Sequence, residues 1–104
     1  MKVVVLDMCR KEMENFPKEV LEDFLDAVAL LSQGLTLRMP LSKTMPSIGN
    51  NVHELRLRDK SGIYRVFYVI KKKDAIYIVH AFHKKTQKTS KKNIKLVKKR
   101  IRRL

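Results

Sequence analysis

The sequence is poor in cysteine, in long apolar runs and, in its second half, in acidic residues. A single cysteine, Cys9, allows no disulfide framework and no cluster of thiolate ligands for zinc. No apolar run approaches the roughly 20 residues that a bilayer-spanning helix needs. The N-terminal apolar stretch, Val3–Leu6, is too short for the apolar part of a signal peptide. We therefore expect a cytoplasmic protein with no membrane partner.

The shortage of acidic residues is confined to the second half of the chain. Residues 1–52 contain 6 Lys or Arg and 7 Asp or Glu, whereas residues 53–104 contain 18 and 3, so the two halves carry net charges of −1 and +15. Residues 84–104 contain 11 Lys or Arg and no acid. A merely solvated lysine face usually carries glutamates as well. The charge pattern favours contact with a polyanion, for which nucleic acid is the usual candidate and an acidic membrane the rival.

The 104 residues suit one domain, spanning residues 1–104, with its own core. A β-branched run predicts a strand over 2–6, and Asp7 is a candidate cap for a short helix ending at Phe16. A 3.6-residue apolar stripe from Val20 to Leu31 predicts a second helix, which Gly34 would end. Residues 35–51 read as a connecting loop.

The rest of the chain predicts three strands and a basic helix. The strands are expected over 52–58, 63–71 and 75–82, joined by the short turns "DKSG" and "KKKD", and therefore form an antiparallel meander. Ser90 would cap the final amphipathic helix. The fold class is α+β, in the order β-α-α-β-β-β-α. We expect a curved antiparallel sheet with helices packed on one face and the other face open.

Cationic side chains are predicted to gather on that open face. Strand alternation places Leu55 and Leu57 toward the helices, and Glu54, Arg56 and Arg58 toward the open side. Arg65, within the apolar run of the next strand, joins them if the register is right. The third strand ends in "HAFHKK", which would deliver His83, Lys84 and Lys85 to the edge of the same surface.

This set of side chains suits phosphate chemistry without a metal ion or another cofactor. Guanidinium groups bind phosphate oxygens bidentately, and converging cations stabilise the charge of a phosphoryl transition state. Glu54, His83 or a lysine of lowered pKa are candidates for proton transfer. The simpler alternative is that Arg65 only pairs with Glu54 across the strands. His80 and His83 are an odd number of residues apart on one strand, so they do not form a metal site.

The motifs "ELR", "YRVFY" and "HAFHKKTQKTSKKNIKLVKKRI" closely resemble the phage-related HigB-like branch of the RelE/ParE toxin superfamily. The resemblance implies a toxin of a type II toxin-antitoxin system with the RelE-like fold. It further implies a ribosome-dependent mRNA endonuclease, or mRNA interferase, that cuts mRNA in the A site of the 70S ribosome. The implied partners are a helix-turn-helix antitoxin, mRNA and ribosomal RNA.

Site residues carried over from the family are Arg56, Arg65 and Lys85. The resemblance assigns them to orienting the 2′-hydroxyl, stabilising the scissile phosphate and assisting the leaving 5′-oxygen. Two positions depart from the RelE pattern. Glu54 replaces a lysine, and the tyrosine that the pattern has a few residues after the position of Lys85 is not present. Glu54 and His83 therefore stay candidates for the general base. The residues expected to contact RNA or the ribosome are Arg58, Lys84, Lys88, Lys91, Lys92 and Lys95.

Two other functions remain open from the sequence. ParE proteins share the fold but inhibit DNA gyrase and are not nucleases, whereas a toxin remnant would be a non-catalytic RNA-binding regulator. The strand arginines and the lysines after the last strand favour the nuclease.

Overall fold

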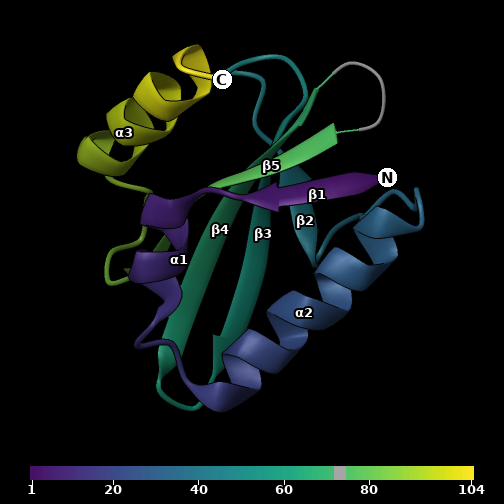
Figure 1. The fold of residues 1–104 in the computed structure, drawn as a ribbon. Coiled ribbons are helices and arrows are strands. Elements are labelled where there is room, and N and C mark those ends of the chain that lie inside the picture. The colour runs from purple at the N-terminus through teal and green to yellow at the C-terminus, as the bar shows by residue number, and fades with distance from the viewer. Residues whose placement is uncertain (72–74) are drawn as a thin grey trace.

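The computed structural model describes residues 1–71 and 75–104, which form an α+β fold around one five-stranded sheet (Figure 1). The predicted α+β class is thereby confirmed. Along the chain the elements are β1 (Lys2–Val5), α1 (Asp7–Met13), α2 (Lys18–Ser32), β2 (Ser42–Thr44), β3 (Val52–Asp59), β4 (Gly62–Lys71), β5 (Ala75–Lys84) and α3 (Lys91–Arg102).

The sheet has the strand order β1-β5-β4-β3-β2. The predicted meander is present, since β3, β4 and β5 pair antiparallel in sequence. The turn predicted at "KKKD" falls largely on residues 72–74, outside the described residues. Two expectations about the sheet were wrong. β1 pairs parallel to β5, so the sheet is mixed, and the predicted loop 35–51 contains the short strand β2, which pairs with β3.

The helices α1 and α2 cover one face of the sheet. In α2, Val20, Phe24, Ala27 and Leu31 are buried, at a spacing that places them on one side of a helix. They pack in the larger core cluster, which also contains Leu55, Val66 and Tyr68 from the sheet. Gly34 follows the helix with φ of 83°, as expected of a residue that ends a helix in the left-handed conformation.

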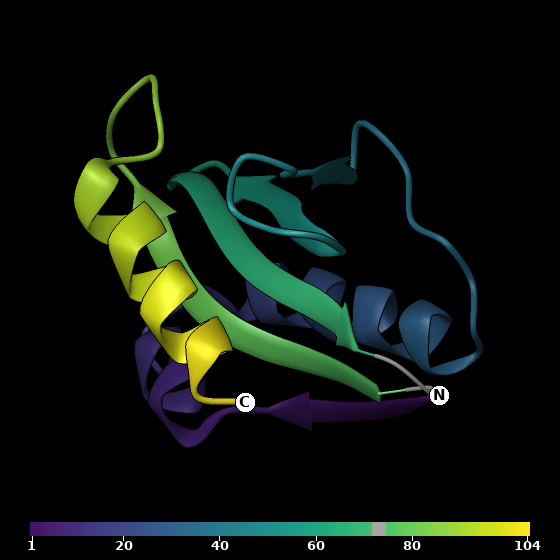
Figure 2. The same ribbon diagram turned by 90° about the horizontal axis from the view of Figure 1, so that it is seen from above.

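The third helix, α3, packs on the other face, along β5 (Figure 2). Val97 of α3 is fully buried in a second cluster with Phe67, Val69 and Val79. The expectation that this second face is open was therefore wrong, because Phe67 and Val69 give it an apolar surface that α3 covers. Ser90 caps α3, as predicted, by accepting a hydrogen bond from the Asn93 amide at 3.2 Å.

A buried polar cluster joins α1, α3 and the edge of β5 beyond the end of β1. Glu12 accepts two hydrogen bonds from the Arg100 guanidinium, at 2.8 and 3.0 Å. Arg100 also donates to the Val79 carbonyl at 2.7 Å, and the Ala81 amide donates to Glu12 at 3.2 Å. Glu12 and Arg100 therefore provide hydrogen-bond partners for backbone groups at this edge of β5, where no strand lies alongside it. None of the helices in the described part of the chain is long and apolar enough to cross a bilayer.

Candidate functional site

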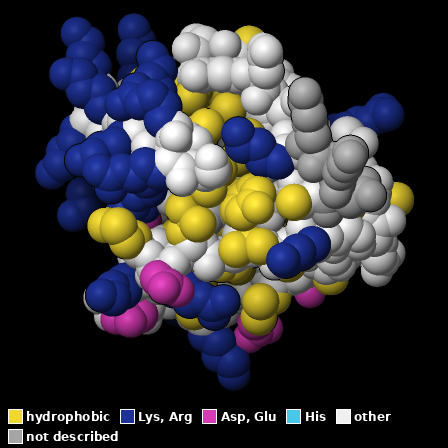
Figure 3. Space-filling view, turned by 45° about the horizontal axis from the view of Figure 1, so that its top comes forward, with side chains coloured by type: hydrophobic (Ala, Val, Ile, Leu, Met, Phe, Trp, Pro, Cys, Tyr) yellow, Lys and Arg dark blue, Asp and Glu magenta, His cyan; other side chains and the backbone are white. Residues whose placement is uncertain are grey.

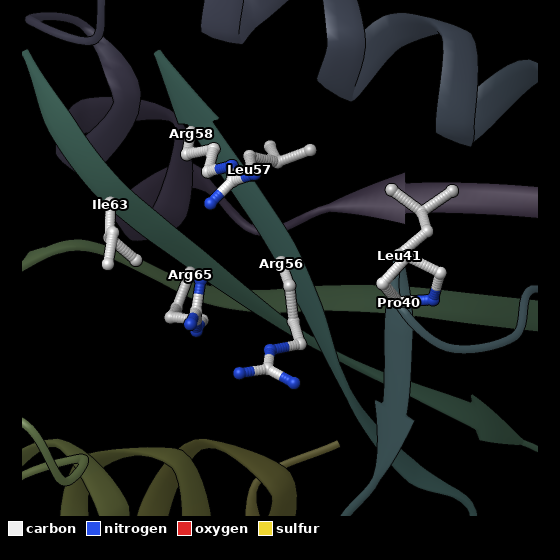
Figure 4. A pocket seen from close by; sticks show the side chains of 7 residues that line it. All are labelled: Pro40, Leu41, Arg56, Leu57, Arg58, Ile63 and Arg65. Carbon is white, nitrogen blue, oxygen red and sulfur yellow. The ribbon is translucent and has the colours of Figure 1, made fainter. Parts of the chain in front are cut away.

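Arg56 of β3 and Arg65 of β4 lie directly opposite each other in the antiparallel ladder. Figure 4 shows their guanidinium groups side by side, while Leu41 and Leu57 point away from them. The register confirms the predicted placement of Arg65 with the charged side of β3. Like charges directly opposite each other destabilise a sheet. The pair therefore needs compensation, and the structure supplies it next to the arginines.

Glu54 is the compensating charge. Its carboxylate is buried, with the residue 4% exposed, and it lies 3.6 Å from Nε of Arg65 and 3.9 Å from Nε of Arg56. The Thr89 hydroxyl donates to its other oxygen at 3.2 Å. The alternative in which Arg65 pairs with Glu54 is thus realised. The Glu54 carboxylate lies near the Nε atom of both arginines. The hydrogen bond from Thr89 connects Glu54 to the segment before α3.

Arg65 keeps hydrogen-bonding capacity after this pairing. It is 5% exposed, and among the described residues its hydrogen bond is a 3.3 Å contact from Nη1 to the Tyr64 carbonyl. Burial lowers the pKa of Arg65, while the Glu54 carboxylate raises it and Arg56 lowers it further. A guanidinium stays protonated in proteins despite such a shift. Arg65 is therefore a buried cation with donors to spare.

The spare donors face a groove made of two adjoining hollows of about 470 and 440 Å³. Arg56, Ile63 and Arg65 line both hollows, so the two are continuous. No acidic residue is among the described residues that line them. The first hollow is completed by Pro40, Leu41, Leu57 and Arg58, and the second by Lys84, Lys85, Thr86 and Gln87.

Lys84 lies closer to the arginines than the sequence suggested. It pairs with Ile63 in the ladder, so its side chain leaves the sheet on the side of Arg65. Burial and then the Arg65 charge lower the pKa of Lys84, with Glu54 acting in the opposite direction. Lys85, the residue predicted as catalytic, lines the same hollow but is exposed. Both lysines are therefore in the groove, and Lys84 is the one whose environment favours losing a proton.

The sequence reasoning missed Lys43. This residue of β2 lies opposite Glu54 in the β2–β3 ladder, and its charge contributes to the lowered pKa of Lys84. No sequence signal pointed to it, because the expected loop had no predicted strand to place its side chain on a face.

The placement of His83 in the groove was wrong. His83 lies opposite Tyr64, and the two rings stack with centroids 4.5 Å apart. Tyr64 in turn packs on Phe16 in the core under α1 and α2, so His83 leaves the sheet on the side opposite Arg65. In the described residues no group of three or more His, Cys, Asp or Glu is arranged to hold a metal ion.

The basic residues of the C-terminal segment form an exposed surface next to the groove. Figure 3 shows Lys and Arg side chains gathered over α3. The predicted RNA-contacting residues Arg58, Lys88, Lys91, Lys92 and Lys95 are all exposed. Arg100 is the exception within α3, because it is buried against Glu12.

Comparison with known proteins places this fold and sequence in context. The sequence model of the family described as phage-derived protein Gp49-like matches residues 11–102. The fold is similar to that of the E. coli toxin RelE, solved as a mutant in the free state, with a TM-score of 0.64 over 99% of this chain and 96% of that chain. The two sequences are 15% identical, so this likeness concerns the fold. No curated protein matches the sequence significantly.

Proposed function

The chain belongs to the Gp49-like family, a RelE/HigB-type toxin family, and we propose that it is a ribosome-dependent mRNA endonuclease neutralised by a helix-turn-helix antitoxin. The observation that carries the proposal is the pair Arg56 and Arg65. The two guanidinium groups lie side by side in a groove with Lys84 and Lys85, and none of the described residues that line the groove is acidic. A phosphodiester is the anion that such a planar, multidentate donor set binds best.

The proposed reaction uses the 2′-hydroxyl of the RNA as the nucleophile. A bond forms between this oxygen and the adjacent phosphorus while the bond to the 5′-oxygen breaks, which gives a 2′,3′-cyclic phosphate and a 5′-hydroxyl. Arg56 orients the 2′-hydroxyl, and Arg65 donates to the phosphate oxygens as negative charge develops on them. These two residues position and stabilise, and they transfer no proton.

Proton transfer falls to the lysines. We assign Lys84, which lies beside Arg65 and whose pKa is lowered by burial and by the Arg65 charge, to accept the proton of the 2′-hydroxyl, and the ammonium of exposed Lys85 to supply one to the leaving 5′-oxygen. Glu54 is less suited to the role of base, because its carboxylate is buried and engaged by Arg65 and Thr89. His83 stacks on Tyr64 on the other face of the sheet.

The basic surface over α3 supports docking on ribosomal RNA. Exposed lysines next to the groove would contact phosphates and release counterions, so binding would weaken steeply as salt is raised. This surface lies on the same face of the sheet as Arg65, since α3 packs on Phe67 and Val69.

The test is a cell-free translation reaction programmed with a defined mRNA, with new 5′ ends mapped by primer extension. We expect cuts at A-site codons with the purified protein. Arg65→Ala should lower the cleavage rate by about 10²- to 10³-fold, the usual effect of losing one transition-state donor. Arg10→Ala, at an exposed arginine of α1, is the matched control and should cleave normally.

Other outcomes would redirect the assignment. Full cleavage by a folded Arg65→Ala protein would remove the arginine from the mechanism. Cuts without ribosomes would identify a free ribonuclease. Intact mRNA together with loss of gyrase supercoiling activity would identify a ParE-like inhibitor, and intact mRNA alone a non-catalytic RNA binder.

A further inference from the structure

Ile63 is an apolar side chain in a ring of cations. It is 40% exposed at the start of β4. In the ladders it lies between Arg58 on β3 and Lys84 on β5, and the next row on the same face contains Arg56 and Arg65. Exposed single hydrophobic residues are common and need no explanation by themselves. The position of Ile63 is informative because it lines both hollows of the groove.

The hollow away from the lysines has an apolar wall facing Ile63. Pro40 forms this wall, whereas the side chain of the adjoining Leu41 points away and packs against the core under α1 and α2 (Figure 4). The wall is attached to β3, because the Arg56 amide donates to the Leu41 carbonyl at 2.7 Å. Arg56 also lies along it, with Nη1 3.6 Å from the Met39 sulfur. The groove therefore has one half lined by arginines and lysines, and a second half in which arginines lie beside the apolar side chains of Pro40 and Ile63.

A nucleotide has the same two-part character. Its phosphate is an anion, and its base has two flat faces that stack on apolar side chains and on guanidinium planes. We propose that the hollow lined by Pro40, Arg56 and Ile63 is a nucleobase subsite, which holds one unstacked base of single-stranded RNA while an adjacent phosphate lies on Arg65. This inference rests on the proposed function and adds a contact to the base.

The proposed subsite does not depend on an aromatic side chain. The segment after Lys85 contains no aromatic side chain on which a base could stack. Ile63 and the Arg56 and Arg58 guanidinium groups supply flat or apolar surface from the strands instead. RNA is favoured over an acidic peptide as the occupant because the hollow is broad and open beside the phosphate-binding half, whereas a peptide carboxylate needs no apolar wall.

The test measures binding of uncleavable RNA. A labelled 2′-O-methyl RNA heptamer and a set of heptamers with one abasic position each are titrated with the full-length protein, and affinities are read by fluorescence anisotropy at fixed salt. We expect the abasic substitution at one position to weaken binding by about tenfold, within the range measured for a stacked base. In Ile63→Ala that penalty should shrink to about threefold or less.

Two controls isolate the contact. Leu25→Ala changes an apolar side chain of α2 that is 61% exposed, and should keep the full abasic penalty. Arg65→Ala should weaken the binding of every heptamer by a similar factor, because its guanidinium binds the phosphate and not the base. Thermal unfolding reports whether each variant is folded, and Ile63→Val replaces Ile63→Ala if the latter is not.

The proposal is overturned if no abasic position matters, if Ile63→Ala keeps the full penalty, or if the intact heptamer does not bind. These results are separable from the cleavage test. Arg65-dependent cleavage that is unchanged in Ile63→Ala would retain the nuclease and remove the subsite, whereas a protein that binds bases but never cleaves would retain the subsite alone.

Discussion

Replacing Glu12 with glutamine tests whether the cluster of Glu12, His80 and Arg100 holds the two faces of the fold together. The Glu12 carboxylate joins α1 to Arg100 of α3, to the Ala81 amide of β5 and to Nδ1 of His80 at 2.9 Å. Glutamine keeps the size of the side chain and removes its charge. It leaves Arg100 as a buried cation, 7% exposed, without its charged partner.

The magnitude follows from the pKa of Glu12. Burial raises this pKa, but hydrogen bonds from His80 and Arg100 and the charge of His80 outweigh it and lower the pKa from 4.5 to about 2. Each unit of difference between the folded and unfolded pKa is worth about 1.4 kcal/mol. The ionised carboxylate therefore contributes about 3 kcal/mol to the free energy of unfolding near neutral pH.

The same pKa gives the pH dependence. Because the pKa of Glu12 is lower in the folded state, its carboxylate contributes fully to the free energy of unfolding above the unfolded pKa near 4.5. This contribution is lost as the pH falls toward the folded pKa of about 2. Urea denaturation of the wild type and of Glu12→Gln should thus differ by about 3 kcal/mol at pH 7 and progressively less below pH 4.5. Glu14→Gln, at an exposed residue following α1, is the matched control and should leave stability within about 0.5 kcal/mol.

A difference between wild type and Glu12→Gln that does not change with pH would refute this reasoning. It would mean that the carboxylate acts only as a neutral hydrogen-bond acceptor. A difference well under 1 kcal/mol at pH 7 would mean that the Arg100 pairing contributes no more than an exposed ion pair.

Two further predictions concern the groove and its support. Glu54→Gln should lower the free energy of unfolding by about 2 kcal/mol. This loss is smaller than that expected on breaking a closely paired buried ion pair, because the contacts of Glu54 to Arg65 and Arg56 are long. Glu54→Gln should also lower kcat while changing KM little, and Glu54→Asp should restore part of the lost kcat. If Glu54 were instead the general base, Glu54→Gln would lower kcat without lowering stability. Gly62→Ala should cost about 1 to 3 kcal/mol, because φ is 145° and a Cβ would lie 2.5 Å from Nε2 of His83. The additional substitution His83→Ala should restore part of the lost stability, measured by denaturant unfolding. If it restores none, the loss comes entirely from the positive φ of the backbone at this position.

Features that depend on local pattern could be predicted from the sequence. The apolar spacing of α2, the end of that helix at Gly34 and the Ser90 cap of α3 need only neighbouring residues. The arginine pair also follows from local information. Short turns fix the register of a meander, and alternation then assigns Arg56 and Arg65 to one face.

Features that depend on distant partners could not be predicted. β2 is three residues long and is defined by its pairing with β3. The helix α3 covers the face that contains Phe67 and Val69 because α1 and α2 already cover the opposite face, and the local sequence does not indicate which face those helices take. Leu25 belongs to the apolar stripe of α2 but is exposed, because Ala27 occupies the position that faces the sheet. His83 was misplaced because the strand predicted to end at residue 82 continues to Lys84, so His83 and Lys84 alternate between the two faces instead of sharing one.

A comparison of the two buried arginines, Arg65 and Arg100, indicates why the apolar strand β4 contains a cation. Arg100 is closely paired through its terminal nitrogens: it donates two hydrogen bonds to Glu12 and one to the Val79 carbonyl, which hold α3 to the sheet, and its Nε has no partner among the described residues. Arg65 is as buried, yet its carboxylate contact is 3.6 Å long and its hydrogen bond to the Tyr64 carbonyl is 3.3 Å. A buried donor that lacks a close partner costs stability, and an apolar residue at that position would avoid the cost. An anion that enters the groove would complete the hydrogen bonds of Arg65, and this is the role of the phosphate in the proposed function.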